Sequence, residues 1–187
     1  MELLDSSDES LIVAGEAIAA GKLVVIPTET VYGLGADAFN PEAVARVFEA
    51  KRRPTFDPLI VHIATLDQID RLVSEFSPKA KLLAEKLWPG PLTLVLPKRP
   101  EVPGIVTSGL DTVAVRFPSQ ILARKIIEYS GTVVAAPSAN PFGYVSPTTA
   151  QHVARSLGDR VDYIVDGGHV SIVLIITVGS FSPPGLS

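Results

Sequence analysis

Short apolar runs alternate with longer amphipathic segments along most of the chain, and this alternation constrains the fold more than any other feature. The run "KLVVIP" (22–27) precedes an amphipathic stretch at 40–53, and "PLIVHIA" (58–64) precedes another at 77–88. Short apolar runs between turn signals are typical of buried strands, and longer periodic segments are typical of helices. The alternation predicts an α/β protein whose sheet carries flanking helices.

Further elements continue the pattern toward the C-terminus. Strands are expected at 91–97, 112–118, 132–137 and 161–168, and helices at 119–131 and 146–159. Prolines stand where several strands should end, because proline cannot donate to a strand ladder. These prolines are Pro27, Pro97, Pro118 and Pro137. Each of them predicts a loop that begins at a strand terminus.

Capping residues mark where the first two helices should begin. Ser6 is expected as the first N-cap, since Glu9 three residues later completes a capping box. Gly21 is placed to end that helix. Asn40 followed by Pro41 predicts the start of the second helix, with proline in the first helical position.

Bulk properties exclude several classes of protein. The 187 residues suit a single domain over 1–187, and the absence of cysteine excludes disulfides and thiolate sites. A formal net charge of −4 provides no global attraction to nucleic acid. No secretory leader is visible, and Asp166 and Gly167 interrupt the most apolar tract. We expect a soluble cytoplasmic protein without a membrane span.

The stretch "IPTETVYGLGADAF" (26–39) places small polar groups directly after an apolar strand. Ligands of α/β proteins bind at the carboxyl ends of strands, so this stretch reads as one wall of a small-molecule site. Gly33 and Gly35 are expected to permit a tight turn or the close approach of a ligand. The alternative is a purely structural turn. The glycines do not complete a dinucleotide fingerprint, and the chain has no Walker-type motif.

Three consecutive cations, residues 51–53, end the helix predicted at 41–50. Compensation of the helix dipole would explain such a run by itself. However, Pro54 and Pro58 restrain the segment, and a strand carrying His62 follows at once. An arginine fork and a lysine point charge both suit phosphate oxygens, so Lys51 and Arg53 could close on one triphosphate.

Two further strand ends carry polar groups. Arg116 interrupts the strand "TVAVRFP" near its end, either as a plain edge residue or as a clamp for a substrate carboxylate. The strand at 132–137 leads into Ser138 and Asn140. No G-x-S-x-G elbow surrounds Ser138, so hydrolysis is disfavoured, and these groups are better suited to donate to phosphate or carboxylate oxygens. The sequence has no motif for a protein-ligated metal.

Five motifs together resemble one family. "IPTETVYGLGADA", "KRRP…PLIVHI", "WPGPLTLVL", "VAVRFP" and "PSAN…SPT" occur in the order and spacing of the YrdC-like threonylcarbamoyl-adenylate synthases, over about residues 10–168. The resemblance implies a twisted, open, mixed sheet with flanking helices. It also implies synthesis of threonylcarbamoyl-AMP from L-threonine, bicarbonate and ATP, with release of pyrophosphate, for threonylcarbamoyl-adenosine modification of tRNA. Transfer proteins that modify tRNA are the implied partners.

The resemblance also assigns site residues. It places Thr30, His62 and Arg116 on L-threonine, and Lys51, Arg53, Thr112, Ser138, Asn140 and Ser146 on ATP. Mg²⁺ would be held mainly by the ATP phosphates, with no protein metal site. No catalytic base is assigned.

From about residue 169 the sequence departs from the family pattern. Val173 replaces a glycine, Ile175 and Ile176 replace an acidic residue and a serine, and Thr177 matches. An arginine segment and the second domain of longer members have no counterpart here. We therefore expect ATP binding with slow or absent synthesis. The alternative hypothesis is an RNA-binding or ribosome-associated module, with tRNA or double-stranded RNA as its partner.

Overall fold

A mixed β-sheet forms the centre of the protein in a computed structural model that describes residues 1–55, 57–171 and 176–179. Within these residues nine strands hydrogen-bond in one sheet. Their spatial order is β1 (Glu2–Leu4), β8 (Tyr163–Val165), β2 (Val24–Pro27), β3 (Tyr32–Asp37), β7 (Val134–Ala135), β4 (Ile60–His62), β6 (Thr112–Arg116), β5 (Leu92–Pro97) and β9 (Ile176–Gly179).

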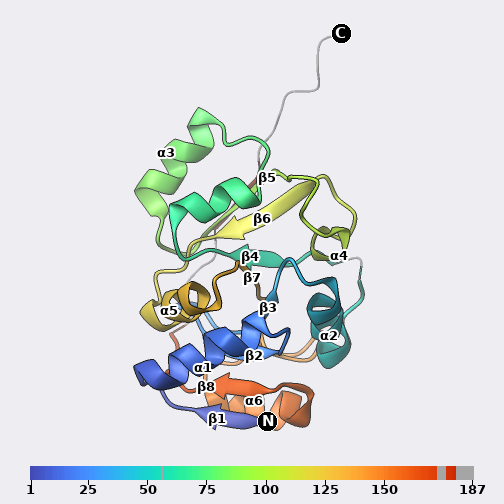
Figure 1. Cartoon of the computed structure of the whole chain (residues 1–187), viewed down its shortest axis with the longest axis vertical. Coiled ribbons are helices and arrows are strands. Elements are labelled where there is room, and N and C mark those ends of the chain that lie inside the picture. Colours follow the sequence, from blue (N-terminus) through green and yellow to red (C-terminus); the bar gives the residue numbers. More distant parts are fainter. Residues whose placement is uncertain (56, 172–175, 180–187) are drawn as a thin grey trace.

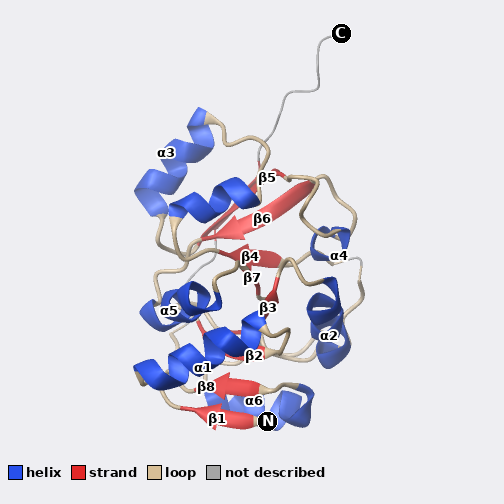
Figure 2. Cartoon of the chain, in the orientation of Figure 1, coloured by secondary structure: helices blue, strands red, loops and turns tan. Residues whose placement is uncertain are grey.

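Parallel and antiparallel pairs occur side by side in this sheet. The pairs β1–β8, β2–β8, β4–β6 and β5–β9 are parallel, and the remaining neighbours are antiparallel. Figure 2 shows the strands stacked along the long axis of the molecule with helices around them. The prediction of a twisted, open, mixed sheet with flanking helices is confirmed. Pro27 and Pro97 are the last residues of their strands, as expected.

The helices surround the sheet. They are α1 (Asp8–Ala19), α2 (Pro41–Lys51), α3 (Pro78–Leu87), α4 (Gly104–Thr107), α5 (Ile121–Ser130) and α6 (Ala150–Leu157), with short 3₁₀ helices η1 (Leu66–Arg71) and η2 (Gly158–Arg160). No helix of the described residues is long and apolar enough to cross a membrane.

A serine caps the first helix and an asparagine caps the second, as predicted, but the position of the serine was predicted one residue too early. Ser7, and not Ser6, caps α1, because its side chain accepts a hydrogen bond from the Ser10 amide. The Asp5 carboxylate accepts hydrogen bonds from the hydroxyls of Ser7 and Ser10, which favours a helix that begins after Ser7. Asn40 caps α2 through the amides of its first turn, as expected.

Alternate residues of the strands face two separate hydrophobic cores. Val25 and Ala135 belong to the larger core, which α2, α3, α4 and α6 cover. Val24 and Val134 belong to the smaller core, which α1 and α5 cover. These two helices lie side by side over the lower half of the sheet in Figure 1. Their contact depends on Gly15, because a Cβ there would lie 2.6 Å from the Cβ of Tyr129.

Gly33 and Gly35 do not form a turn, contrary to the sequence prediction. Both lie in β3, which pairs with β2 as an antiparallel hairpin, and the turn lies at residues 28–31. A Cβ at Gly35 would lie 3.0 Å from a methyl of Val134. The absence of a side chain at Gly35 therefore gives space to the neighbouring strand β7.

Part of the predicted departure at the C-terminus lies outside the described residues. Val173 and Ile175 are not among them, whereas Ile176 and Thr177 begin β9. β9 pairs with β5 in parallel, and Ile176 is 43% exposed. Ile176 therefore occupies an edge strand in contact with solvent and not a buried apolar strand.

Candidate functional site

A row of polar residues crosses the sheet where helices α1 and α5 cease to cover it. His62, Arg116, Thr93 and Thr177 lie in register on β4, β6, β5 and β9. Side chains in register on neighbouring strands project to the same face of a sheet. His62 is also in register with Val134, which belongs to the core under α1 and α5. One face of the sheet thus changes from apolar to polar between β7 and β4.

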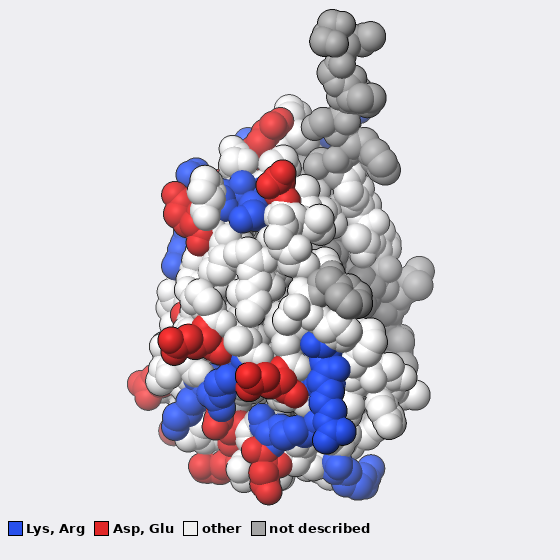
Figure 3. Space-filling model, turned by 90° about the vertical axis from the view of Figure 1, so that its right-hand side faces the viewer, with Lys and Arg blue, Asp and Glu red and all other residues white. Residues whose placement is uncertain are grey.

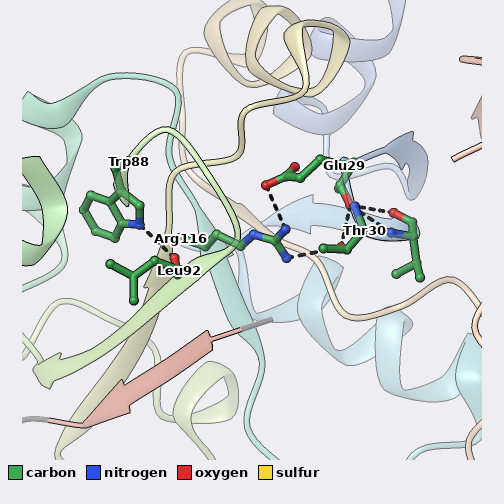
Figure 4. Close-up of polar contacts among 7 residues, drawn as sticks. Glu29, Thr30, Trp88, Leu92 and Arg116 are labelled. Atoms are coloured by element: carbon green, nitrogen blue, oxygen red, sulfur yellow. Dashed lines mark hydrogen bonds and ion pairs between the residues drawn. The ribbon is translucent and has the colours of Figure 1, made fainter. Parts of the chain in front are cut away.

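Arg116 reaches from the end of β6 to the turn between β2 and β3. Figure 4 shows its guanidinium directed at the side chains of Glu29 and Thr30. One terminal nitrogen donates to Glu29 Oε1 at 2.8 Å, and the other donates to Thr30 Oγ1 at 3.3 Å. The side chains of Arg116 and Glu29 are 3% and 13% exposed, so this ion pair is largely shielded from solvent.

The turn that presents Glu29 and Thr30 is organised by Thr28. The Thr28 hydroxyl donates to the carbonyl of Val31 at 2.6 Å and accepts from the amides of Thr30 and Val31. Its oxygen also lies 3.0 Å from Thr30 Oγ1. Threonine and serine hydroxyls commonly close turns in this way. The turn holds two polar side chains against β6 although they are distant from it in sequence.

Arg116 changes the protonation behaviour of both of its titratable neighbours. Burial by itself would raise the pKa of the Glu29 carboxyl, but the charge and hydrogen bond of Arg116 outweigh burial and lower this pKa. Burial and then the Arg116 charge lower the pKa of His62 to about 3. Glu29 is therefore an anion near neutral pH, and His62 is a neutral imidazole.

Several buried polar atoms of this cluster have no hydrogen-bond partner among the described residues. They are Glu29 Oε2, His62 Nδ1, Thr93 Oγ1 and Arg116 Nε. Buried polar atoms are normally paired, so each exception requires an explanation. Four such atoms around one ion pair indicate that the cluster is built to receive a polar ligand.

A second cluster joins the end of α2 to the loop after β7. Lys51 is 1% exposed, and its ammonium donates to the carbonyl oxygens of Ser138 and Asn140. In return, the amide of Phe142 donates to the Lys51 carbonyl at 2.8 Å. Burial and then the nearby charge of Arg53 lower the pKa of Lys51 to about 8. The lysine therefore ties the loop to the helix.

The other residues predicted for ATP are less closely connected. Arg53 forms an ion pair with Asp57 at 2.8 Å. Asn140 donates through its amide to the carbonyls of Pro141 and Tyr144. Ser146 lies in the same loop, half-buried.

Thr112 stands apart from the rest of the predicted ATP set. It begins β6 and is in register with Pro97. At about 3.3 Å per residue it lies about 13 Å along the strand from Arg116. The structure thus groups Lys51, Ser138 and Asn140, and the role of Thr112 on ATP stays a prediction.

A pocket of about 320 Å³ adjoins the second cluster. It is lined by Lys51, Arg52, Pro141, Phe142, Tyr144, Ser156 and Arg160. The guanidinium of Arg160 donates to three backbone carbonyls, so this charge is used within the protein. On the face that carries α2 and α4, basic and acidic side chains are intermixed, with neutral surface between them (Figure 3).

Three residues of the site were not predicted from the sequence. The first is Glu29, which lies between Thr28 and Thr30 at the strand end. Thr93 could have been found as the only polar residue of the run "LTLVL". Tyr32 is fully buried, and its hydroxyl donates to the Gly168 carbonyl at 2.7 Å and accepts from the Gly167 amide at 3.1 Å. Tyr32 therefore fixes the "DGG" turn beside the end of β2.

No group of three or more His, Cys, Asp or Glu side chains positioned to hold a metal ion occurs in the described part of the chain. The donors near Lys51 are ammonium, guanidinium, amide and hydroxyl groups. Such groups bind phosphate oxygens, whereas Mg²⁺ prefers oxygen ligands and commonly binds through the phosphates of a nucleotide.

The family model named for Sua5, YciO and YrdC, described as "Telomere recombination", matches residues 16–180. A threonylcarbamoyl-AMP synthase of Pyrococcus abyssi is 52% identical over 166 residues, covering 89% of this chain and 49% of the relative. A Bacillus subtilis protein of the same name is 47% identical over 176 residues, covering 94% and 51%. The chain thus spans about half the length of these relatives.

Solved structures of related proteins have a similar fold. The crystal structure of P. abyssi Sua5 complexed with L-threonine superposes with a TM-score of 0.94 at 46% identity, covering 96% of this chain and 54% of that one. The crystal structure of E. coli YciO superposes with a TM-score of 0.84 at 20% identity, covering 99% and 93%. The second likeness shows the fold alone.

Proposed function

The chain belongs to the Sua5/YciO/YrdC family, and on that premise we propose that it is a threonylcarbamoyl-AMP synthase, or the synthase part of one. The reaction joins L-threonine, bicarbonate and ATP and releases pyrophosphate. Its product would serve the threonylcarbamoyl-adenosine modification of tRNA in the cytoplasm, through transfer proteins that accept the threonylcarbamoyl group.

The observation that carries this proposal is the cluster around Arg116. Thr30, His62 and Arg116 were predicted for L-threonine from separate motifs. In the structure His62 and Arg116 end the neighbouring strands β4 and β6, and Thr30, in the turn after β2, accepts a hydrogen bond from Arg116. A relative of 46% identity has been crystallised with L-threonine. An arginine fork matches a carboxylate, and a neutral buried imidazole can accept a hydrogen bond from a hydroxyl.

Positioning explains how such a cluster would assist the reaction. The deprotonated amine of threonine must add to CO₂ with release of a proton, or to bicarbonate with loss of water. The resulting carbamate oxygen must then attack the α-phosphorus of ATP, from which pyrophosphate leaves. Reactants held in the correct geometry react much faster than free ones. In this proposal Arg116 and Thr30 fix the amino acid, and the shielded surroundings limit competition from water.

The second cluster would hold the nucleotide. Lys51 and Arg53 supply cations at the end of α2, and Ser138, Asn140, Ser146 and Thr112 supply polar groups, as predicted. The pairing of Lys51 with two carbonyls supports a fixed position for its charge. We expect Mg²⁺ to enter with ATP on the phosphate oxygens, where it would neutralise charge.

The test is an assay with ATP, labelled bicarbonate and L-threonine that measures pyrophosphate and the adenylate. Arg116→Lys keeps the charge but loses the fork, so we expect the KM for L-threonine to rise about tenfold. Arg46→Lys is the matched control, because Arg46 pairs with Asp162 at 2.9 Å on the surface. We expect no change in that variant.

The same assay separates the alternatives. Pyrophosphate release that requires both bicarbonate and L-threonine supports a synthase, and its rate tests the low turnover predicted from positions 173–176. Failure to bind L-threonine would contradict the proposed function. Salt-dependent binding of double-stranded RNA without adenylate synthesis would instead support the RNA-binding hypothesis.

A further inference from the structure

We propose that Glu29 recognises the α-amino group of the amino-acid substrate, so that Glu29 and Arg116 together form a site for a zwitterion. This inference rests on the proposed function and names a residue that sequence reasoning left without a role. Three features of the described structure carry it, namely the pairing of the two side chains, their unpaired atoms and their placement.

The first feature is the incomplete use of the ion pair. Among the described residues, Glu29 Oε1 and the terminal nitrogens of Arg116 have partners, while Glu29 Oε2 and Arg116 Nε are buried and have none. One of these atoms is an acceptor on an anion, and the other is a donor on a cation. An α-amino acid offers the complementary pair, an ammonium and a carboxylate attached to the same α-carbon.

The second feature is the charge of Glu29 itself. Arg116 lowers the pKa of the Glu29 carboxyl against the opposing effect of burial, so this group is an anion at neutral pH. The backbone amides of Glu29 and Ser119 also favour the anion, yet neither is hydrogen-bonded to Oε2. A buried anion with an unused oxygen attracts a cation and disfavours a second carboxylate. The amine is therefore the part of the substrate that suits Glu29.

The third feature is the position of Glu29 relative to the predicted threonine residues. The Oγ1 atom of its neighbour Thr30 accepts a hydrogen bond from the same guanidinium, and His62 is in register with Arg116. The turn that carries Glu29 is held by the hydroxyl of Thr28. Glu29 thus belongs to a positioned set in which the amine, carboxylate and hydroxyl of threonine each have a complementary group.

The test compares two ligands that differ only in the amine. L-Threonine and (R)-3-hydroxybutyrate share the carboxylate and the hydroxyl, and only the first has the amino group. Calorimetry would measure both dissociation constants for the wild-type chain and for Glu29→Gln, with and without ATP. A hydrogen bond to a charged group changes affinity by about tenfold or more.

We expect Glu29→Gln to weaken L-threonine binding at least about tenfold and not to weaken 3-hydroxybutyrate, since the variant no longer competes for Arg116. Glu29→Asp, which keeps the carboxylate one methylene further back, should give an intermediate loss for L-threonine alone. Glu16→Gln on the exposed face of α1 is the matched control and should change neither ligand.

Other outcomes overturn the inference in distinguishable ways. Equal weakening of both ligands would mean that Glu29 only positions Arg116. No change for either ligand would mean that Glu29 does not contact the substrate. If the wild-type chain binds no L-threonine, the proposed function fails first, and the inference fails with it.

Discussion

Arg116 and Lys51, two buried cations of the described residues, are compensated in different ways. Arg116 is paired with a carboxylate at 2.8 Å, whereas Lys51 is paired with two backbone carbonyls. Both side chains are almost fully buried. A carboxylate supplies a full opposite charge, but carbonyls supply only partial charges. The difference is visible in the pKa of Lys51, which burial lowers to about 8.

The comparison indicates what each cation contributes. A buried ion pair is costly to break, because either partner left alone is a buried charge without compensation. A buried lysine held by carbonyls can lose its proton instead and remain hydrogen-bonded. The Arg116–Glu29 pair is thus expected to keep its position and charges, whereas the charge of Lys51 depends on pH and on bound anions.

The largest effect is expected when the ion pair is broken on one side. Arg116→Met leaves the Glu29 carboxylate buried without a partner, and we expect the free energy of unfolding to fall by about 3–5 kcal/mol. Urea unfolding would measure the change. The double variant Arg116→Met/Glu29→Gln should recover part of the loss. A loss below about 1 kcal/mol would show that the pair behaves as an exposed one.

A smaller effect is expected at the second cation. Lys51→Met leaves the carbonyls of Ser138 and Asn140 without this donor but also removes a buried charge. We expect a net loss of about 1–3 kcal/mol in the free energy of unfolding. Retention of full stability would show that the carbonyls find other donors. A loss as large as that of Arg116→Met would remove the distinction between the two sites.

The pH dependence of the stability should also distinguish Lys51 from Arg116. Unfolded Lys51 keeps the ordinary pKa of 10.5, while folded Lys51 loses its proton near pH 8. Between these values the unfolded state binds more protons, so the stability of the wild type rises with pH relative to Lys51→Met. From pH 8 to 9 we expect a relative gain of about 1 kcal/mol.

Chemical denaturation of both proteins at several pH values would test the gain. A flat difference between wild type and Lys51→Met would mean that Lys51 keeps an ordinary pKa. ATP should bind less tightly as the pH rises past 8, if the charge of Lys51 holds phosphate.

The two sites also differ in how far the sequence predicts them. His62 and Arg116 end parallel neighbouring strands, so their proximity could be predicted from the rule that the ends of parallel strands meet at one edge. Thr30 follows β2, which runs antiparallel to β4 and β6, so its contact with Arg116 does not follow from that rule. Glu29 and Arg116 are 87 positions apart, and no local pattern shows that their side chains meet. The carbonyl partners of Lys51 have no sequence signature at all, because every residue has a carbonyl.

In the fold, too, local sequence patterns predict some features and not others. Apolar runs and caps predicted most strands and helices, since burial and capping leave a local pattern. β3 was missed because its glycines weaken the strand signal. Both glycines lie against residues of the strand end at 134–137, since a Cβ at Gly35 would meet Val134 and a Cβ at Gly33 would meet Ala136. Contacts between distant segments are therefore the part that the structure adds.

The smallest effect is predicted for substitutions of Arg52, which lies between Lys51 and Arg53. Arg52 caps α2 with a φ of 53°, in the left-handed region where glycine is favoured. A side chain there costs about 1 kcal/mol, so Arg52→Gly should raise the free energy of unfolding by about 0.5–1 kcal/mol. Arg52→Ala removes the same charge but keeps a Cβ, so it should give little or no gain. Thermal or urea unfolding of both variants would separate the two causes. An equal gain in both would mean that repulsion between Arg52 and the neighbouring Lys51 destabilises this end of the helix, and that backbone conformation does not.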